Sequence, residues 1–272
     1  GVDLAVGRPR HTVVAEGIDT ARIDDAATTV ADAHASPTVL EDLHSAIGRM
    51  PSERHGLPLI VSVGRMHEHK GMARLVEAFA LHRELAERAN LVIVGGALDE
   101  PSAQEAAELA RVRRLFDEYP GLRERVVLLG RRPHEDVALV LAAARSGWRS
   151  SVGPAGSYVC ASAKEEFGLA ILEAMAAGLP VTAPVQGGPA TYVDHGRTGT
   201  LVDTTDHFEL AAGVQAALDL SVDQSVPGRT RALVDERYTL QRMARTLTAV
   251  YRVTTGASTL GAEVAGDLED AA

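Results

Sequence analysis

The sequence has little cysteine and no long apolar run, and each absence excludes a class of protein. Cys160 is the one cysteine in 272 residues, so no disulfide framework can form, and its apolar surroundings predict a buried, inert thiol. This cysteine usage fits a reducing cytoplasm, where we expect the protein to act. The longest apolar runs, such as VALVLAAA at 137–144, are far too short to span a bilayer. No signal-peptide pattern opens the chain at Gly1, and we expect the N-terminal part of a longer protein to precede it.

Positive charge and the common nucleotide-binding motifs are also scarce. The formal net charge is −10, which disfavours a nucleic-acid or anionic-membrane partner and makes any anion-binding site a local feature. No GxGxxG follows the first buried strand, and neither GxxxxGK(S/T) nor GxSxG occurs. A nicotinamide or flavin Rossmann domain, a P-loop NTPase and an α/β-hydrolase are therefore disfavoured. The composition, 46% hydrophobic and 24% charged, is that of an ordinary globular protein with one large α/β domain or two small ones.

Apolar strand-like segments alternate with segments of helical spacing along most of the chain. We expect strands at 57–65, 89–96, 125–130, 157–162 and 179–184, with short strands within 11–19 and 195–203. We expect helices near 38–49, at 72–86, 102–118 and 134–145, from about 168, and at 206–219 and 238–252. The rest of 24–56 is polar and irregular. Strand–helix alternation with fully apolar strands predicts an α/β fold, a Rossmann-like doubly wound parallel sheet.

Ligands of such sheets bind beyond the carboxyl ends of the strands, so the loops there are the candidate site. In VGRMHEHKG (63–71), Arg65 and Lys70 lie five apart between glycines, and two cations beside a helix N-terminus suit an anion such as phosphate. A solvated turn that only caps the helix is the alternative. His67 and His69 of the same loop have no third metal ligand nearby, so we interpret them as solvated.

A second loop, KEEFGLAILE, carries two glutamates around a Phe-Gly-Leu turn. A helix beginning near Gly168 would present the backbone N–H groups of Phe167, Gly168 and Leu169, which together with the helix dipole suit a phosphate or sugar hydroxyls. Glu165 would precede this helix and Glu173 would lie in its second turn, so the two carboxylates can reach opposite ends of one ligand. The alternative is that the acidic residues only balance the helix macrodipole.

Two glycine-rich loops follow. PVQGGPAT (184–191) has paired glycines after a strand, which permit either a close approach of the backbone to a ligand or a tight turn alone. DHGRTGTLVD (194–203) is most simply a structural turn that leads into an edge strand.

In this order and spacing, the loops resemble the C-terminal, nucleotide-sugar-binding domain of retaining family-4 (group 1) glycosyltransferases with the GT-B architecture. VVAEGID resembles the interdomain Gly-x-Asp segment, VGRMHEHKG the Arg…Lys diphosphate loop, EEFGLAILEAMAAGLPVTA the E-x7-E motif, and QGGPAT the paired-glycine loop. The likeness covers about residues 11–252. ANLVIVGG, GSYVCASAKEEFGL and GLPVTAPVQGGPATYVDHGRTGTLVD lean it toward the sucrose synthase and sucrose-phosphate synthase branch. Thr191 replaces a usual Glu, Ala161 replaces a frequent Pro, and the connector 145–156 can alter the base or sugar pocket.

The resemblance implies roles for the loop residues. Arg65 and Lys70 would neutralise the diphosphate of the leaving nucleotide, and Glu165 would accept hydrogen bonds from the donor sugar without acting as a nucleophile. These three would be the catalytic residues, and Glu173 would hold the ribose hydroxyls. The other donor-binding residues would be Gly64, Phe167, Gly168, Leu169, Gly130, Arg131, Gly187 and Gly188, with Gly130 and Arg131 near the base. Because side chains and a helix dipole supply the positive charge, we expect no metal and no other cofactor.

The resemblance also implies the reaction and the partners. We expect transfer of a hexosyl group, glucose, from a UDP- or ADP-sugar to a sugar or sugar-phosphate acceptor, with retention of configuration. The alternatives are a nucleotide-sugar-binding fragment, inactive without its N-terminal domain, and a GT-B nucleotide-sugar epimerase. We expect 1–20 to end the N-terminal domain and linker, 21–252 to bind the donor, and 253–272 to be a disordered acidic tail. No nucleic acid and no integral membrane segment is expected.

Overall fold

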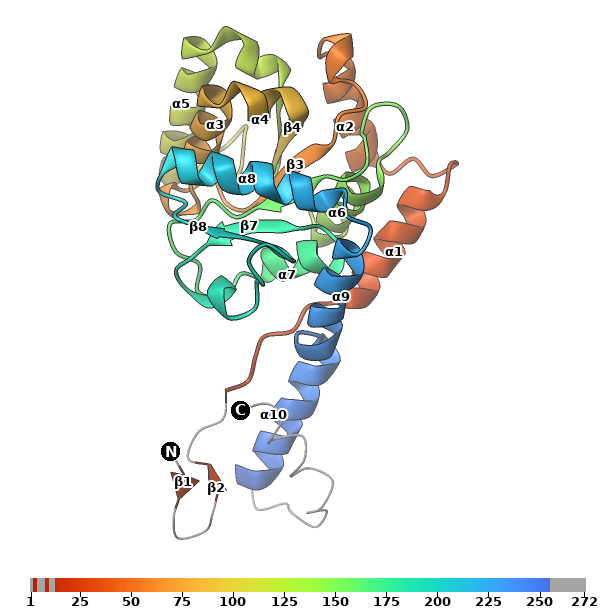
Figure 1. The fold of residues 1–272 in the computed structure, drawn as a ribbon, viewed down its shortest axis with the longest axis vertical. Helices are drawn as coiled ribbons and strands as arrows, with labels where there is room; N and C mark the ends of the chain where they lie inside the picture. The colour runs from red at the N-terminus through yellow and green to blue at the C-terminus, as the bar shows by residue number, and fades with distance from the viewer. Residues whose placement is uncertain (1, 4–7, 10–12, 255–272) are drawn as a thin grey trace.

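A six-stranded sheet runs through the part of the chain that the computed structural model describes, residues 2–3, 8–9 and 13–254 (Figure 1). The strand order is β5-β4-β3-β6-β7-β8, and every neighbouring pair is parallel. The strands are β3 (Leu59–Val63), β4 (Asn90–Val94), β5 (Val126–Gly130), β6 (Ser157–Val159), β7 (Val181–Pro184) and β8 (Gly199–Val202). Most of their side chains are buried on both faces, which explains the continuous apolar runs and confirms the predicted parallel sheet. Two short strands, β1 (Val2–Asp3) and β2 (Arg8–Pro9), pair antiparallel apart from it.

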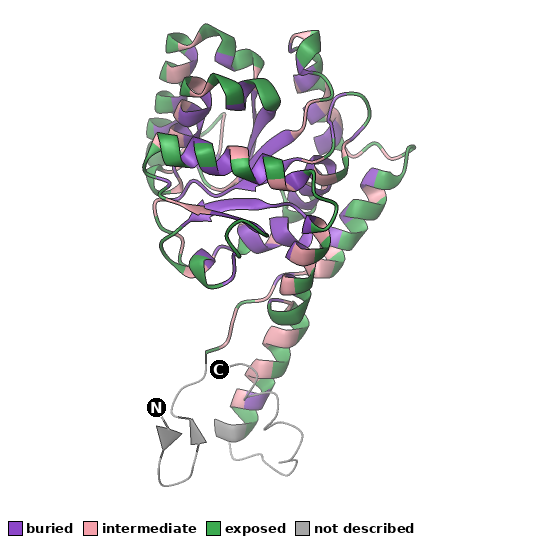
Figure 2. Cartoon of the chain, in the orientation of Figure 1, coloured by how far each residue is buried: buried purple, intermediate pink, exposed green. Residues whose placement is uncertain are grey.

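Helices cover both faces of this sheet, and the buried residues gather in the sheet and on the inner sides of the helices (Figure 2). On one face, Leu59 and Val61 share a core with α1 (Thr20–Ala31), α2 (Thr38–Gly48), α6 (His134–Ser146), α7 (Leu169–Ala176) and α9 (Val226–Arg237). On the other face, Ile60 packs with α3 (Met72–Leu81), α4 (Arg83–Arg88), α5 (Ala103–Glu118) and α8 (His207–Ser221). Successive residues of β3 thus face opposite cores, as the pleat of a strand requires.

Two helices are absent from the sequence prediction, and one predicted helix is interrupted. Residues 20–31, of which 24–31 was predicted to be irregular, form α1 with Ile23, Ala26 and Val30 buried on one side. Helix α9 follows α8 without having been anticipated. The predicted helix at 72–86 is broken at His82, which ends α3 and precedes α4.

The chain enters and leaves this domain through adjacent segments. The strand predicted within 11–19 is wrong for residues 13–17, which have no regular structure, while 11–12 lie outside the described residues. Ile18 N donates to Tyr238 O at 2.8 Å and Leu240 N donates to Ile18 O at 3.0 Å. Helix α10 (Leu240–Thr254) then extends away from the sheet (Figure 1).

Helix α10 includes the first two residues of the predicted disordered tail, and the remainder, 255–272, lies outside the described residues. Among the helices of the described ranges, none has both the length and the hydropathy of a membrane-spanning segment.

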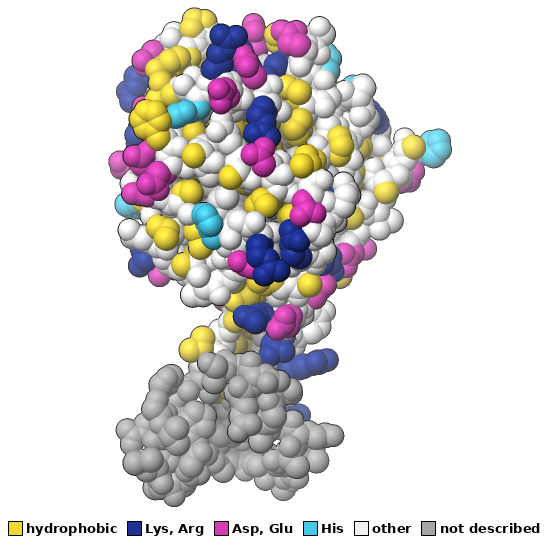
Figure 3. All heavy atoms as spheres, viewed as in Figure 1, with side chains coloured by type: hydrophobic (Ala, Val, Ile, Leu, Met, Phe, Trp, Pro, Cys, Tyr) yellow, Lys and Arg dark blue, Asp and Glu magenta, His cyan; other side chains and the backbone are white. Residues whose placement is uncertain are grey.

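The face of the molecule in Figure 3 carries charges of both signs, with Lys and Arg side chains lying among Asp and Glu. Several exposed side chains form ion pairs, such as Arg83 with Glu87 at 2.6 Å and Arg88 with Asp219 at 2.6 Å. Exposed pairs of this kind contribute at most about 1 kcal/mol each. Any anion-binding site of this acidic chain therefore needs a local arrangement of donors.

The amino-terminal edge of the sheet is closed by a buried arginine. Arg54 is 6% exposed, and its guanidinium donates to the Asn90 side chain at 2.9 Å and to the carbonyl oxygens of Ala86 and Ala89. The Asn90 amide donates back to the Arg54 carbonyl at 2.8 Å. Burial lowers the pKa of Arg54 to about 10, so the guanidinium stays charged at neutral pH.

The connector 145–156 lies at this same edge, immediately before β6. Trp148 is buried there, meets His44 edge-on, and has the Arg149 guanidinium 4.1 Å from its ring centre. Arg149 also pairs with Glu41 at 2.7 Å. No residue of 145–156 lines the cavity at the opposite edge, and an effect of this connector on the base or sugar pocket stays a prediction.

Candidate functional site

A cavity of about 700 Å³ opens at the carboxyl-terminal edge of the sheet. Its walls come from the loops after β3, β5 and β6 and from the first turns of α6 and α7. The predicted site residues that line it are Gly64, Arg65, Lys70, Glu165, Phe167, Gly168, Leu169 and Glu173. It is also lined by residues absent from the prediction, among them Glu16, Arg132, His134, Tyr158 and Ser162.

The loop after β3 brings two cations to the cavity. Gly71 ends this loop with φ +67, and a side chain there would collide with the Ala161 carbonyl of the neighbouring loop. Arg65 is exposed and forms no hydrogen bond or ion pair with the described residues. In the first turn of α3, the Ala73 N–H already donates to Glu108 at 2.8 Å. Of the two cationic side chains in this loop, Arg65 is therefore available for an anion, whereas Lys70 is paired with Glu165.

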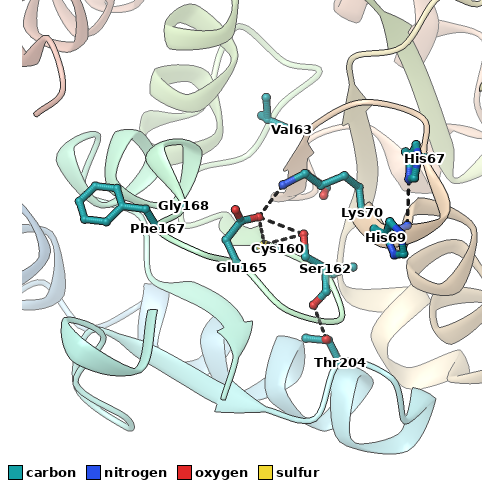
Figure 4. A network of polar contacts seen from close by, with 12 residues as sticks. Val63, His67, His69, Lys70, Cys160, Ser162, Glu165, Phe167, Gly168 and Thr204 are labelled. Atoms are coloured by element: carbon teal, nitrogen blue, oxygen red, sulfur yellow. Dashed lines mark hydrogen bonds and ion pairs between the residues drawn. The ribbon is translucent and has the colours of Figure 1, made fainter. Parts of the chain in front are cut away.

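Glu165 is the centre of a polar network in the loop after β6 (Figure 4). Lys70 Nζ lies 2.6 Å from its Oε2, and the two side chains are 33% and 16% exposed. Ser162 Oγ donates to the same oxygen at 3.1 Å, and Cys160 Sγ lies 3.8 Å from it. Thr204 Oγ1 donates to the Ser162 carbonyl at 2.5 Å. The structure thus joins the predicted phosphate-binding cation directly to the predicted sugar-binding carboxylate.

The start of α7 offers backbone donors to the same cavity. The N–H groups of Phe167, Gly168 and Leu169 donate to no acceptor among the described residues. Gly168 precedes the helix with φ +91, and Tyr192 Oη donates to the Phe167 carbonyl at 2.6 Å, which holds the turn from behind. The Phe167 ring itself points away from the Glu165 network (Figure 4). Unpaired N–H groups at a helix start attract anions, as the sequence predicts here.

Glu173 lies in the second turn of α7 and is 19% exposed. Its Oε1 is 3.9 Å from His134 Nδ1, at the start of α6. Burial raises the pKa of Glu173 above its ordinary value, and His134 and Arg22 oppose this rise. Glu165 and Glu173 therefore flank the first turn of α7 and face one cavity.

The paired glycines lie behind the acidic loop and do not line the cavity. The Gly188 N–H donates to the carbonyl oxygens of Glu165 at 3.0 Å and Glu166 at 3.1 Å. Gly187 has φ +101 and forms a parallel bridge with Glu165. A side chain at Gly187 or Gly188 would collide with one of those two carbonyls. The paired glycines therefore approach the Glu165 loop closely, and the donor contact predicted for Gly187 and Gly188 stays a prediction.

The residues after β5 that line the cavity are not the two that were predicted to lie near the base. Gly130 and Arg131 do not line the cavity, whereas Arg132 and His134 do. Arg132 also pairs with Asp42 at 2.8 Å. The sequence contains the signal, an Arg-Arg pair after a strand, but the direction in which the chain leaves the strand decides which arginine turns inward.

Three polar residues of the segment 157–162 lie at the cavity floor, and sequence reasoning assigned a site role to none of them. Tyr158 is fully buried, and burial raises its pKa well above the ordinary value. Burial likewise raises the pKa of the Cys160 thiol, in agreement with the predicted inert cysteine. Ser162 is 1% exposed and supports Glu165. Their apolar neighbours hide these positions, because the segment reads as an ordinary buried strand.

The two histidines of the loop after β3 contact each other. Their rings stack at 5.1 Å, and the His69 N–H donates to His67 Nδ1 at 3.2 Å. Within the described ranges, no group of three or more His, Cys, Asp and Glu side chains is arranged to hold a metal ion.

A wholly parallel sheet with helices on both faces and a cavity at its carboxyl edge is a Rossmann-like α/β domain, the fold of the C-terminal half of GT-B glycosyltransferases. The sucrose-phosphate synthase from Thermosynechococcus elongatus matches with a TM-score of 0.68 and 27% identity, over 93% of this chain and 54% of that one. The Anabaena protein HepE, solved in complex with UDP and glucose, matches in fold with a TM-score of 0.61 and 21% identity, over 86% of this chain and 55% of that one.

Residues 49–230 match the family model of the glycosyl transferases group 1, and the chain belongs to this family. A sucrose synthase from Acidithiobacillus caldus is 30% identical over 231 residues, which is 80% of this chain and 29% of that protein. The resemblance and its lean toward the sucrose synthases and sucrose-phosphate synthases are confirmed. The chain spans less than a third of that curated relative and about half of the two solved structures.

Proposed function

We propose that this chain is the donor-binding half of a retaining glycosyltransferase, which transfers glucose from a UDP- or ADP-sugar to a sugar or sugar-phosphate acceptor. The observation that carries this proposal is the convergence of cations, unpaired amides and two carboxylates on one cavity at the carboxyl edge of a parallel sheet. The relatives named for making sucrose or sucrose phosphate support a sugar acceptor. Membership of the glycosyl transferases group 1 argues against the epimerase alternative.

The diphosphate of the donor binds between Arg65, Lys70 and the free N–H groups at the start of α7. Arg65 forks onto phosphate oxygens, and Lys70 adds a mobile point charge. Negative charge develops on the diphosphate as the bond to the sugar breaks, so donors fixed around it lower the barrier. These residues make catalysis independent of a metal. Treatment with EDTA is therefore expected to leave donor affinity within about twofold, and a tenfold loss would contradict this part of the proposal.

The two glutamates bind hydroxyl groups at the two ends of the donor. Glu165 accepts hydrogen bonds from the sugar, and Glu173 accepts them from the ribose, since a carboxylate is acceptor-only when ionised. The acceptor hydroxyl attacks the anomeric carbon from the side of the departing diphosphate, and its proton passes to the leaving oxygen. The configuration is retained without a carboxylate nucleophile.

The test is calorimetric titration of the 272-residue chain with UDP, ADP and their glucose esters, followed by assays for nucleotide release in the presence of sugar and sugar-phosphate acceptors. Binding with release supports the enzyme. Binding without release supports a second candidate, a donor-binding fragment that needs an N-terminal domain, which the partial coverage of the relatives favours. If neither nucleoside diphosphate nor either glucose ester binds, both candidates are wrong.

A further inference from the structure

The Lys70–Glu165 pair joins two side chains that a bound donor needs separately. The Nζ–Oε2 distance is 2.6 Å, and both side chains line the cavity (Figure 4). In the proposed function Lys70 binds the diphosphate and Glu165 binds the sugar. An ammonium held by a carboxylate interacts more weakly with a second anion, because the carboxylate already neutralises part of its charge. Arg65, by contrast, has no ion-pair partner among the described residues.

The backbones on which these two side chains stand are tied together. The Ala163 N–H donates to the His69 carbonyl at 3.2 Å, and Arg74 donates to the Ala161 carbonyl at 3.3 Å. Gly71 approaches that same carbonyl so closely that no side chain fits between them. The two loops therefore cannot separate easily. Breaking the pair requires only that the long Lys70 side chain turns away.

Glu165 keeps other partners when Lys70 leaves. Ser162 Oγ lies 3.1 Å from Oε2 and Cys160 Sγ lies 3.8 Å from it, so this oxygen remains held at the cavity floor. Oε1 accepts no hydrogen bond from the described residues and is available to a ligand hydroxyl. The carboxylate can thus exchange the ammonium for sugar hydroxyls without being left bare.

We propose that Glu165 is a specificity-determining residue that competes with the diphosphate for Lys70. This inference rests on the proposed function. A hexosyl group supplies hydroxyl donors that replace the ammonium on Glu165 and release Lys70 to the diphosphate. A bare nucleoside diphosphate supplies no such donor, so Glu165 retains Lys70 and binding is weaker. The site therefore selects the sugar nucleotide over the nucleoside diphosphate that the reaction leaves behind.

The test is calorimetric titration of the chain and its Glu165→Gln variant with whichever of UDP and ADP binds the unchanged chain tighter, and with its glucose ester. The amide has no charge to hold Lys70, so the Kd of the bare diphosphate is expected to fall about three- to fivefold, the range of a partly exposed ion pair. The Kd of the glucose ester is expected to rise about threefold. Glu135→Gln removes an equal charge from an exposed residue beside the cavity-lining His134, and it is expected to change neither value.

Opposite shifts in the two Kd values support the inference, because damage to the site would weaken both ligands. An unchanged or higher Kd for the bare diphosphate, with the glucose ester still bound, overturns the inference and leaves the proposed function standing. If the unchanged chain binds neither ligand, the proposed function fails first. Glu165→Asp, which draws the carboxylate away from Lys70, is a second variant should Glu165→Gln fold poorly, and it is expected to tighten bare diphosphate binding as well.

Discussion

At the amino-terminal edge of the sheet, Arg54 is 6% exposed and gives hydrogen bonds to the Asn90 side chain and to two carbonyl oxygens. At the carboxyl-terminal edge, the Lys70 side chain is 33% exposed and contacts one carboxylate, beside backbone N–H groups that have no acceptor in the described part of the chain. At one edge, the same sheet thus carries a buried charge that is held by three acceptors. At the other edge, it carries charges with few or no partners among the described residues.

This difference separates groups that hold the fold together from groups that await a ligand. Buried polar groups are normally all hydrogen-bonded, and each unpaired one needs an explanation. Arg54 meets the rule, and its loss would strand three acceptors. The amides at the start of α7 and the exposed Arg65 guanidinium have no acceptor among the described residues, which leaves them free to bind a ligand. Substitutions at the first edge should therefore reduce stability, and those at the second should reduce binding.

Arg54→Met is expected to have the largest effect, a loss of about 3–5 kcal/mol in the free energy of unfolding. The variant leaves the Asn90 side chain and the carbonyls of Ala86 and Ala89 buried without their donor, and each unsatisfied group costs about 1–3 kcal/mol. Urea denaturation followed by circular dichroism measures the change. Arg49→Met, at an exposed arginine nearby in sequence, should change stability by less than about 0.5 kcal/mol. Equal losses in both variants would show that Arg54 has no special role.

Lys70→Ala is expected to show the reverse pattern at the other edge. Loss of a charged hydrogen bond to the diphosphate is worth about 1.5–3 kcal/mol, so the affinity for the nucleotide-sugar donor should fall about 10- to 100-fold. The free energy of unfolding should change by less than about 1 kcal/mol, because Glu165 keeps Ser162 and some exposure to water. Lys164→Ala, at an exposed lysine that does not line the cavity, is the matched control and should bind normally. Unchanged affinity after Lys70→Ala would refute the site.

The fold was predictable from sequence wherever burial is two-sided. Strands β3, β4 and β5 are apolar at nearly every position because helices cover both faces, and glycines follow two of them closely. Helix α1 was not predicted from the sequence, because only Ile23, Ala26 and Val30 of its residues are buried and many of the others are Thr or Asp. At the break, His82 contacts His207 of α8 at 3.3 Å, and no local sequence pattern records this contact.

The site was predictable where a motif assigns it and unpredictable where geometry decides. Lys70, Glu165 and Glu173 follow from the order of loops at strand ends, and all three line the cavity. The choice of Arg132 over Arg131 depends on the path of the chain after β5. The support of Glu165 by the paired glycines depends on contacts between loops far apart in sequence.

Gly187→Ala is expected to affect both stability and donor binding, because Gly187 has a structural role and also supports the loop that carries Glu165. The φ of +101 and the collision with the Glu165 carbonyl should reduce the free energy of unfolding by about 1–2 kcal/mol. Donor affinity should fall about tenfold as the acidic loop shifts. Gly228→Ala in helix α9 meets open space and should instead stabilise the protein by about 0.5–1 kcal/mol. Thermal unfolding and calorimetry measure both changes. Full donor affinity in Gly187→Ala would show that the paired glycines do not contribute to the site.

Glu173→Gln is expected to have the smallest effect on stability and to raise it. Burial raises the folded-state pKa of Glu173, so the folded state holds the proton more tightly than the unfolded state does. That contribution is fully present below the unfolded value of 4.5 and is lost as the pH rises through the folded pKa, so at pH 7 the buried carboxylate destabilises the protein. The amide removes this penalty, and the Tm should rise roughly 1–3 °C at pH 7.

Two measurements connect this gain to the proposed role of Glu173 in binding the donor. The difference in Tm should shrink as the pH falls toward 4.5, because both proteins then carry a neutral side chain. Donor affinity should fall about three- to tenfold at pH 7, because an amide replaces a charged acceptor. Scanning calorimetry across pH and titration with the glucose ester measure the two effects, with exposed Glu135→Gln as the control. If the variant loses both stability and affinity, Glu173 is a structural group of the kind that Arg54 represents at the amino-terminal edge. The contrast between the two edges would then not hold at this residue.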